Sequence, residues 1–186
     1  WLAHFHGCYM NSKGVGLWEI GTYWHLDTRS DELNEIESQS VKNAAKPIDS
    51  VLNNAIFKTM VHGDAKLANF CFSKDVSSVA AVDFQYVGKG CGMKDVAYFL
   101  SSCLLEKELE TLEAELLTYY FSELKKSVNL FHPKIDFKAL KLEWSSLYCF
   151  AWADFTRFLL GWMPTHQKLN GYSMNKMNEV VNHLKN

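Results

Sequence analysis

The stretch of sequence that decides the fold reads HGDAKLAN at residues 62–69 and VAAVDFQ at residues 79–85. Its first part places a carboxylate, Asp64, in a tight turn that contains a glycine, and an amide, Asn69, follows five positions later. Its second part reads as a buried β-strand that ends at another carboxylate, Asp83. A strand–turn–strand arrangement would bring these three side chains together, and their oxygen atoms suit Mg²⁺ and a phosphate.

The composition around this stretch limits the class of protein. The chain has 186 residues, the length of about one domain, and its 48% of hydrophobic residues can form a sizeable core. The net charge of −2 predicts no basic surface and therefore no nucleic-acid partner. The apolar runs are too short for a membrane span. Five widely spaced cysteines without a C-x-x-C motif predict free thiols and a reducing, cytoplasmic location.

Hydrophobic periodicity predicts a mainly helical α+β chain wrapped around a small β-hairpin. Pro47 is expected to begin an amphipathic helix, and Ser173 is expected to cap the last helix. The glycine-rich residues 87–92 are expected to be a flexible loop. Further helices are expected over residues 1–8, 95–105, 109–128 and 136–162, and strands over 59–61, 70–72 and 79–84.

The central stretch has the residue types that phosphate transfer to an alcohol requires. Positioning and charge stabilisation dominate that reaction, so the protein needs few reactive groups. Asp64 can accept the proton of the acceptor hydroxyl, and Lys66 can reach the transferred phosphate as a point charge. Asn69 and Asp83 are ligands of the right hardness for Mg²⁺.

The order Asp64, Asn69 and then Asp83-Phe84-Gln85 resembles the catalytic and metal-binding motifs of the aminoglycoside phosphotransferase and choline kinase superfamily, which is related to the protein kinases. The residues in and around these motifs are most similar to those of the ecdysteroid-kinase-like branch of this superfamily. The resemblance implies that Asp64 is the catalytic base, that Asn69 and Asp83 bind Mg²⁺ and the nucleotide, that ATP is the phosphate donor and that a small-molecule alcohol is the acceptor. It also gives Asp95 a structural role bracing the catalytic loop, although the Pro usual in that motif is missing here.

The same resemblance implies that residues 1–186 form the C-terminal lobe of a protein-kinase-like fold. The opening residues read as the middle of an apolar helix without a capping residue, which predicts that the chain is a segment of a longer protein. Its partner would be an N-terminal lobe that carries the glycine-rich loop and the strand lysine of kinases. The isolated segment is then expected to turn over poorly.

Other interpretations remain open from the sequence. The chain could be a non-catalytic kinase-like domain that binds a nucleotide or a partner, or a metal-dependent hydrolase that uses Asp64 and Asp83. Residues 88–92 lack the spacing of a phosphate-binding P-loop. The aromatic residues of 144–162 could form core or line an acceptor pocket that holds an ammonium group. Asp154 and Arg157 could be pocket residues or part of a solvated face.

Overall fold

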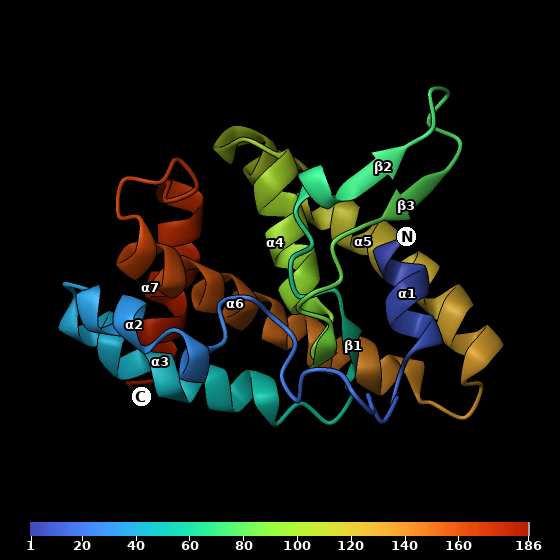
Figure 1. Ribbon diagram of the computed structural model, residues 1–186, viewed down its shortest axis with the longest axis horizontal. Coiled ribbons are helices and arrows are strands. Elements are labelled where there is room, and N and C mark those ends of the chain that lie inside the picture. The colour runs from blue at the N-terminus through green and yellow to red at the C-terminus, as the bar shows by residue number, and fades with distance from the viewer. Residues whose placement is uncertain (186) are drawn as a thin grey trace.

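The computed structural model describes residues 1–185 and shows a largely helical body with two small antiparallel sheets (Figure 1). The helices are α1 (Leu2–Cys8), α2 (Ser30–Glu35), α3 (Gln39–Asn53), α4 (Met93–Cys103), α5 (Glu106–Phe131), α6 (Phe137–Trp162) and α7 (Gly171–His183). The strands are β1 (Thr59–Val61), β2 (Phe70–Phe72), β3 (Val79–Ala81) and β4 (Gly88–Gly90), with 3₁₀ turns at Leu26–Thr28 and Leu67–Asn69. The predicted mainly helical α+β class is confirmed.

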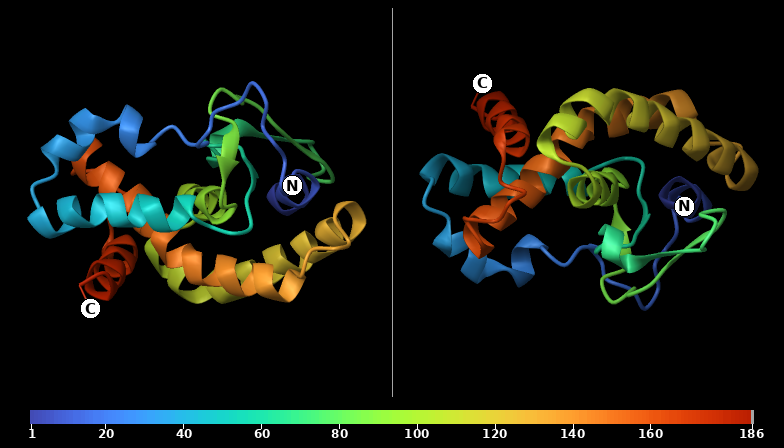
Figure 2. Two further views of the ribbon diagram at one scale, coloured as in Figure 1. Left: turned by 90° about the horizontal axis from the view of Figure 1, so that it is seen from below. Right: turned by 90° about the horizontal axis from the view of Figure 1, so that it is seen from above.

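Helix α6 is the centre of the fold. It begins where the Asp136 side chain accepts hydrogen bonds from the backbone N–H groups of Lys138 and Ala139, at 2.9 and 3.1 Å, which is a favourable helix start. Helices α2, α3, α4 and α7 pack against it, while α1 lies against α5 (Figure 2). α6 is apolar around much of its circumference, so it can be covered on several sides, and Trp144 and Trp152 are fully buried.

The two sheets frame the stretch that decides the fold. β2 and β3 form the predicted hairpin, with Phe70 opposite Ala81, and it projects from the helical body (Figure 1). β1, which leads into the turn at residues 62–64, pairs with β4, with Met60 opposite Lys89. The side chains of β1 are all buried, so the turn begins from a fixed backbone.

The expectation of a flexible loop at residues 87–92 was wrong, because Gly88–Gly90 form strand β4. The reason is that the backbone near Trp18 lies very close to this strand. A Cβ atom on Gly88 would lie 2.4 Å from the carbonyl oxygen of Trp18. Glycine therefore lets the chain near Trp18 pack on this strand, where the Gly21 N–H donates to the Lys89 carbonyl at 2.9 Å.

The predicted starts of two helices were also wrong. α3 begins at Gln39 and includes Pro47 in its interior. A proline there removes a backbone donor, but burial of Val41, Ile48 and Leu52 along the same helix outweighs that loss. α7 is capped by Asn170, whose side chain accepts from the Ser173 N–H at 3.1 Å, and Ser173 lies inside the helix.

Replacing Pro47 with Ala is expected to stabilise the protein by about 2–3 kcal/mol. Proline costs about 3 kcal/mol relative to alanine in a helix interior, and the loss of its rigidity in the unfolded chain returns up to about 1 kcal/mol. Pro47 is exposed, so little packing is lost. Urea unfolding followed by circular dichroism measures the change. Pro164→Ala, in the turn after α6, is the control without a helix to repair, and equal changes in both variants would contradict the explanation.

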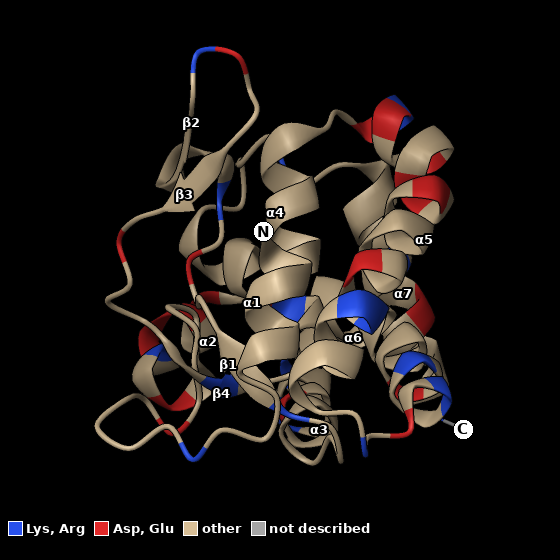
Figure 3. Cartoon of the chain, turned by 90° about the vertical axis from the view of Figure 1, so that its right-hand side faces the viewer, with Lys and Arg blue, Asp and Glu red and all other residues tan. Residues whose placement is uncertain are grey.

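Several acidic residues of α5 lie on the surface of the protein. Figure 3 shows acidic residues along α5, of which Glu108, Glu110 and Glu115 are exposed, whereas Leu109 and Leu124 of the same helix are buried. All five cysteines are free. Within residues 1–185, no helix combines the length and the apolar character that crossing a membrane would require.

Candidate functional site

The site is built on the turn that follows β1. Gly63 has a φ of +80°, a conformation that favours glycine. A Cβ atom at this position would also lie 2.3 Å from the carbonyl oxygen of Tyr86. The turn is thus available only to glycine, and it fixes the backbone from which Asp64 projects.

A buried carboxylate, Asp95 at the start of α4, holds this turn. Its oxygens accept hydrogen bonds from the backbone N–H groups of His62 and Gly63, at 2.6 and 3.0 Å. His6 contacts the same carboxylate through Nε2 at 3.1 Å, and its Nδ1 lies 2.7 Å from the Tyr120 hydroxyl. The structure therefore gives Asp95 the bracing role that the resemblance implied. The contact of His6 with Asp95 was not predicted, because a histidine in an apolar helix reads from the sequence as a packed or solvent-facing residue.

Three of the four predicted site residues meet at one carboxylate. Asp64 is 4% exposed. Its Oδ2 accepts from Lys66 Nζ at 2.9 Å and from Asn69 Nδ2 at 3.0 Å. The same Asn69 amide also donates to the Asp64 carbonyl at 2.8 Å. Asp64 is held in one orientation by these contacts, while the side chain of Lys66 remains 39% exposed and able to contact a substrate.

The fourth residue, Asp83, is brought to the same loop by the backbone of Val82. The Val82 N–H donates to the Asn69 carbonyl at 2.9 Å, and the His62 ring lies 2.9 Å from the Val82 carbonyl. Asp83 has a φ of +64°, a left-handed conformation that costs free energy and is common at functional sites. The prediction that it ends a buried strand was wrong: β3 stops at Ala81, the left-handed φ of Asp83 does not continue a strand, and Asp83 is exposed.

The donor set fits a magnesium ion. The Asn69 amide nitrogen points to Asp64, so its oxygen is left for a ligand, and within residues 1–185 the Asp83 carboxylate has no hydrogen-bond or ion-pair partner. The described part of the chain contains no group of three or more His, Cys, Asp or Glu side chains that could hold a metal ion. Mg²⁺ commonly binds through one or two protein groups together with water and substrate phosphates, which agrees with this small set.

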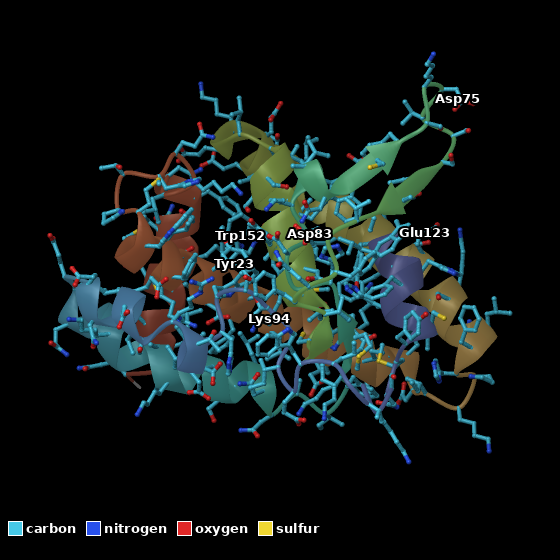
Figure 4. The ribbon with its side chains drawn as sticks, in the orientation of Figure 1. Tyr23, Asp75, Asp83, Lys94, Glu123 and Trp152 are labelled. Carbon is cyan, nitrogen blue, oxygen red and sulfur yellow. The ribbon has the colours of Figure 1, made fainter. Side chains whose placement is uncertain are left out.

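Two tyrosines form a wall beside Asp64. The Tyr23 N–H donates to the Gly63 carbonyl at 3.0 Å, and its ring lies 5.7 Å from that of Tyr98. Burial, together with the nearby Asp64 carboxylate, raises the pKa of Tyr23 to about 12, and the pKa of Tyr98 is raised for the same reasons. Both phenols therefore stay protonated at neutral pH and can donate hydrogen bonds at the edge of the site. Figure 4 shows Tyr23 on the side of the site that faces α6.

A lysine from the loop between α6 and α7 closes this wall. The ammonium of Lys168 lies 4.7 Å from the centre of the Tyr98 ring and 5.5 Å from that of Phe155. No sequence pattern indicated this residue, because a single lysine in a polar loop reads as solvated.

The aromatic residues of 144–162 are mainly core. Trp144, Tyr148, Trp152 and Phe155 are all less than 5% exposed, whereas Trp162 is 49% exposed. Neither interpretation of Asp154 and Arg157 was right, because both are at most 1% exposed.

Asp154 and Arg157 belong to a buried ion cluster. The Asp154 carboxylate contacts Arg157 at 2.7 Å and Lys94 at 3.3 Å, and it accepts the Trp24 indole N–H at 2.8 Å. Burial alone would raise the pKa of Asp154, but the two cations hold it below its usual range. The cluster joins α6, α4 and Trp24, the residue after Tyr23, and so it supports the wall of the site from behind.

Comparison with known proteins agrees with this geometry. No curated protein and no solved structure matches the chain. The sequence model of the ecdysteroid kinase-like family matches residues 19–132, which is more than half of the chain and includes Asp64, Lys66, Asn69 and Asp83. The resemblance inferred from these motifs is thereby confirmed. The chain belongs to the ecdysteroid kinase-like family.

Proposed function

We propose that this chain is the catalytic and acceptor-binding lobe of an ATP- and Mg²⁺-dependent enzyme that phosphorylates a hydroxyl group of a small molecule. One observation carries the proposal: the buried Asp64 carboxylate is held in a glycine turn, with Lys66 and Asn69 both bonded to one of its oxygens. Membership of a kinase-like family supports the reaction class.

In the proposed reaction, the acceptor hydroxyl oxygen attacks the γ-phosphorus of ATP. A new O–P bond forms, the bond from the γ-phosphorus to the β–γ bridging oxygen breaks, and ADP leaves. Asp64 accepts the hydroxyl proton. Lys66, 2.9 Å from Asp64, is close enough to the base to contact the phosphate during transfer. The contacts from Lys66 and Asn69 keep the carboxylate aimed at one place, which favours the positioning that this reaction needs.

Asn69 and Asp83 would hold Mg²⁺, which when bound neutralises charge on the phosphates. We assign the remaining contacts with the nucleotide to an N-terminal lobe of the same protein. Kinases carry a glycine-rich loop and a strand lysine in that lobe. The other proposed partner is a small-molecule alcohol. We propose neither a nucleic-acid partner nor a membrane partner, and we propose a cytoplasmic location.

The proposal is tested with the full-length protein, radiolabelled ATP and a panel of small alcohols, with Mg²⁺ present or removed by chelation. Transfer to at least one alcohol that stops on chelation is the expected result. Asp83→Ala should raise the Mg²⁺ concentration that gives the half-maximal rate by about tenfold or more, because one of two protein ligands is lost. A titration of rate against Mg²⁺ concentration measures the shift.

Asp75→Ala is a matched control for that variant. Asp75 is an exposed carboxylate at the tip of the β2–β3 hairpin, far from the loop, as Figure 4 shows. Its loss should leave the Mg²⁺ dependence unchanged. A nucleotide- and Mg²⁺-dependent rise in thermal stability without transfer to any alcohol would contradict catalysis and favour the non-catalytic binding domain.

A further inference from the structure

Tyr120 of α5 reaches the turn at residues 62–64 through two other side chains, His6 and Asp95. Resting on the proposed function, we infer that Tyr120 is a positioning residue for the base Asp64. Its hydroxyl fixes the orientation of the His6 ring, and this ring holds the Asp95 carboxylate that binds the turn. Tyr120 belongs to none of the sequence motifs described above, so its role follows from its contacts.

The first observation is that each hydrogen bond in this connection has a defined direction. The Asp95 carboxylate accepts from the backbone N–H groups of His62 and Gly63, as an ionised carboxylate does. Such a group only accepts, so Nε2 of His6, at 3.1 Å from Asp95, carries a proton. The other nitrogen of a neutral imidazole is an acceptor. Since Nδ1 lies 2.7 Å from the Tyr120 oxygen, the Tyr120 hydroxyl donates to it.

The second observation is that the Tyr120 hydroxyl has one acceptor for its proton. The residue is 8% exposed, and within residues 1–185 its hydroxyl forms a hydrogen bond with His6 alone. Burial, and secondarily the nearby Cys91 and Asp95, raises the pKa of Tyr120 well above its usual value, so the phenol stays protonated at neutral pH. A doubly protonated His6 would leave this buried proton without an acceptor, which disfavours that form.

The third observation is that packing holds the rest of His6. The residue is fully buried, its ring lies 6.0 Å from that of Trp144, and its backbone carbonyl accepts from the Thr59 hydroxyl at 2.6 Å. A ring turned by half a rotation about its Cβ–Cγ bond would point carbon atoms at both Tyr120 and Asp95 and would lose both hydrogen bonds. Tyr120 therefore stabilises the one orientation in which His6 donates to Asp95.

This orientation matters because the turn carries Asp64. Without the Tyr120 hydroxyl, Nδ1 of His6 would be a buried acceptor without a partner, and the ring could turn away. Asp95 would then lose its donor from α1, and its carboxylate could shift together with the two N–H groups that it holds. A misplacement of about 1 Å can lower a rate by about 10²-fold. Turnover should therefore depend on a hydroxyl that contacts the turn only through other side chains.

The test is Tyr120→Phe in the full-length protein, which removes the hydroxyl and keeps the ring. With an alcohol that the wild type phosphorylates, kcat is expected to fall by about tenfold. The KM values for ATP and for the alcohol should stay close to those of the wild type, because the substrates still bind and the base is misplaced.

Ser127→Ala is the matched control. Ser127 is also a buried residue of α5 whose hydroxyl donates to α1, at 3.0 Å from the His4 carbonyl oxygen. Each variant removes one buried hydroxyl and should lower the thermal midpoint by a few degrees. Ser127→Ala should nevertheless leave kcat unchanged, since its contact does not lead to Asp95. An equal loss of kcat in the two variants would show that Tyr120 acts only through stability.

NMR of the full-length protein with isotope-labelled histidine tests the contact without turnover. The His6 signals, assigned with a His6→Gln variant, should show a proton on Nε2 and none on Nδ1 in the wild type. In Tyr120→Phe, the Nδ1 signal should move to the position of a nitrogen without a hydrogen bond. A proton on Nδ1 in the wild type, or an unchanged Nδ1 signal in Tyr120→Phe, would overturn the inference.

A double-mutant cycle tests whether Tyr120 acts through His6. His6→Leu removes both ring nitrogens, so Tyr120→Phe should lower kcat no further in that background. A further loss of about tenfold there, or an unchanged kcat in Tyr120→Phe alone, would contradict the positioning role. If His6→Leu does not fold, the NMR comparison and the Ser127→Ala control provide the test. A wild type that transfers phosphate to no alcohol would contradict the proposed function itself, whereas normal transfer with a failed NMR comparison would contradict the role of Tyr120 alone.

Discussion

The Asp64→Asn variant is expected to transfer phosphate about 10²- to 10⁴-fold more slowly than the wild type, the range typical for loss of a general base. The amide oxygen that replaces Oδ2 can still accept from Lys66 or from Asn69, so the turn should keep its conformation. The amide cannot accept the acceptor's proton. Rates of ADP release with saturating ATP and acceptor measure the loss, and nucleotide binding should change little.

Two comparisons separate loss of the base from loss of structure. The thermal midpoint of Asp64→Asn should stay close to that of the wild type, because Asp95 and Gly63 set the turn independently of this carboxylate. Asp75→Asn removes a carboxylate from the hairpin tip and should transfer phosphate at the wild-type rate. Unchanged turnover in Asp64→Asn would exclude Asp64 as the base.

The Asp154→Ala variant is expected to lose about 3–5 kcal/mol of stability, because it leaves Lys94 and Arg157 buried without a counter-charge. The Trp24 indole would also lose its acceptor. For a chain of this length, that loss lowers the thermal midpoint by about 6–20 °C. Urea unfolding measures it directly. If the alanine variant does not fold, Asp154→Asn, which retains an acceptor for Trp24, provides a milder test in the same direction.

The charge of Asp154 also predicts a pH dependence. Its pKa is depressed in the folded protein, so its contribution is complete above the unfolded pKa of about 4 and is lost as the pH falls through the lower folded value. Asp154→Asn should lose stability less steeply in acid than the wild type. Glu19→Ala removes a carboxylate paired with Lys89 at 2.8 Å on the surface and should not shift the midpoint measurably. An equal effect of Asp154→Ala and Glu19→Ala would contradict the buried-pair explanation.

The local parts of the site could be predicted because their signals lie close together in the sequence. The residues from Asp64 to Asn69 form one turn and a single 3₁₀ step, so their spacing alone determines which side chains meet. The long helices were also predictable, since a hydrophobic periodicity over more than two turns outweighs the conformational preference of any single residue. Buried helices such as α4 and α6 have this property.

The remaining parts depend on contacts between distant residues, which one sequence does not reveal. His6 reaches Asp95 and Tyr120, Trp24 reaches Asp154, and Lys168 reaches Tyr98. Pro47 and Gly88 misled the prediction for a related reason. Proline usually starts a helix and glycine usually marks a loop, but tertiary packing overrode both preferences.

The connection from His6 through Asp95 to the turn at residues 62–64 has a consequence for the order of folding. His6 and Asp95 are 89 residues apart, and His6 and Tyr120 are 114 residues apart. Contacts across such separations form slowly, because the entropy of loop closure must be overcome first. During synthesis, Asp64 is therefore added to the chain before Asp95 and Tyr120, which complete its brace. The brace becomes complete only after the chain has been extended through Tyr120, so the base becomes fixed late in folding.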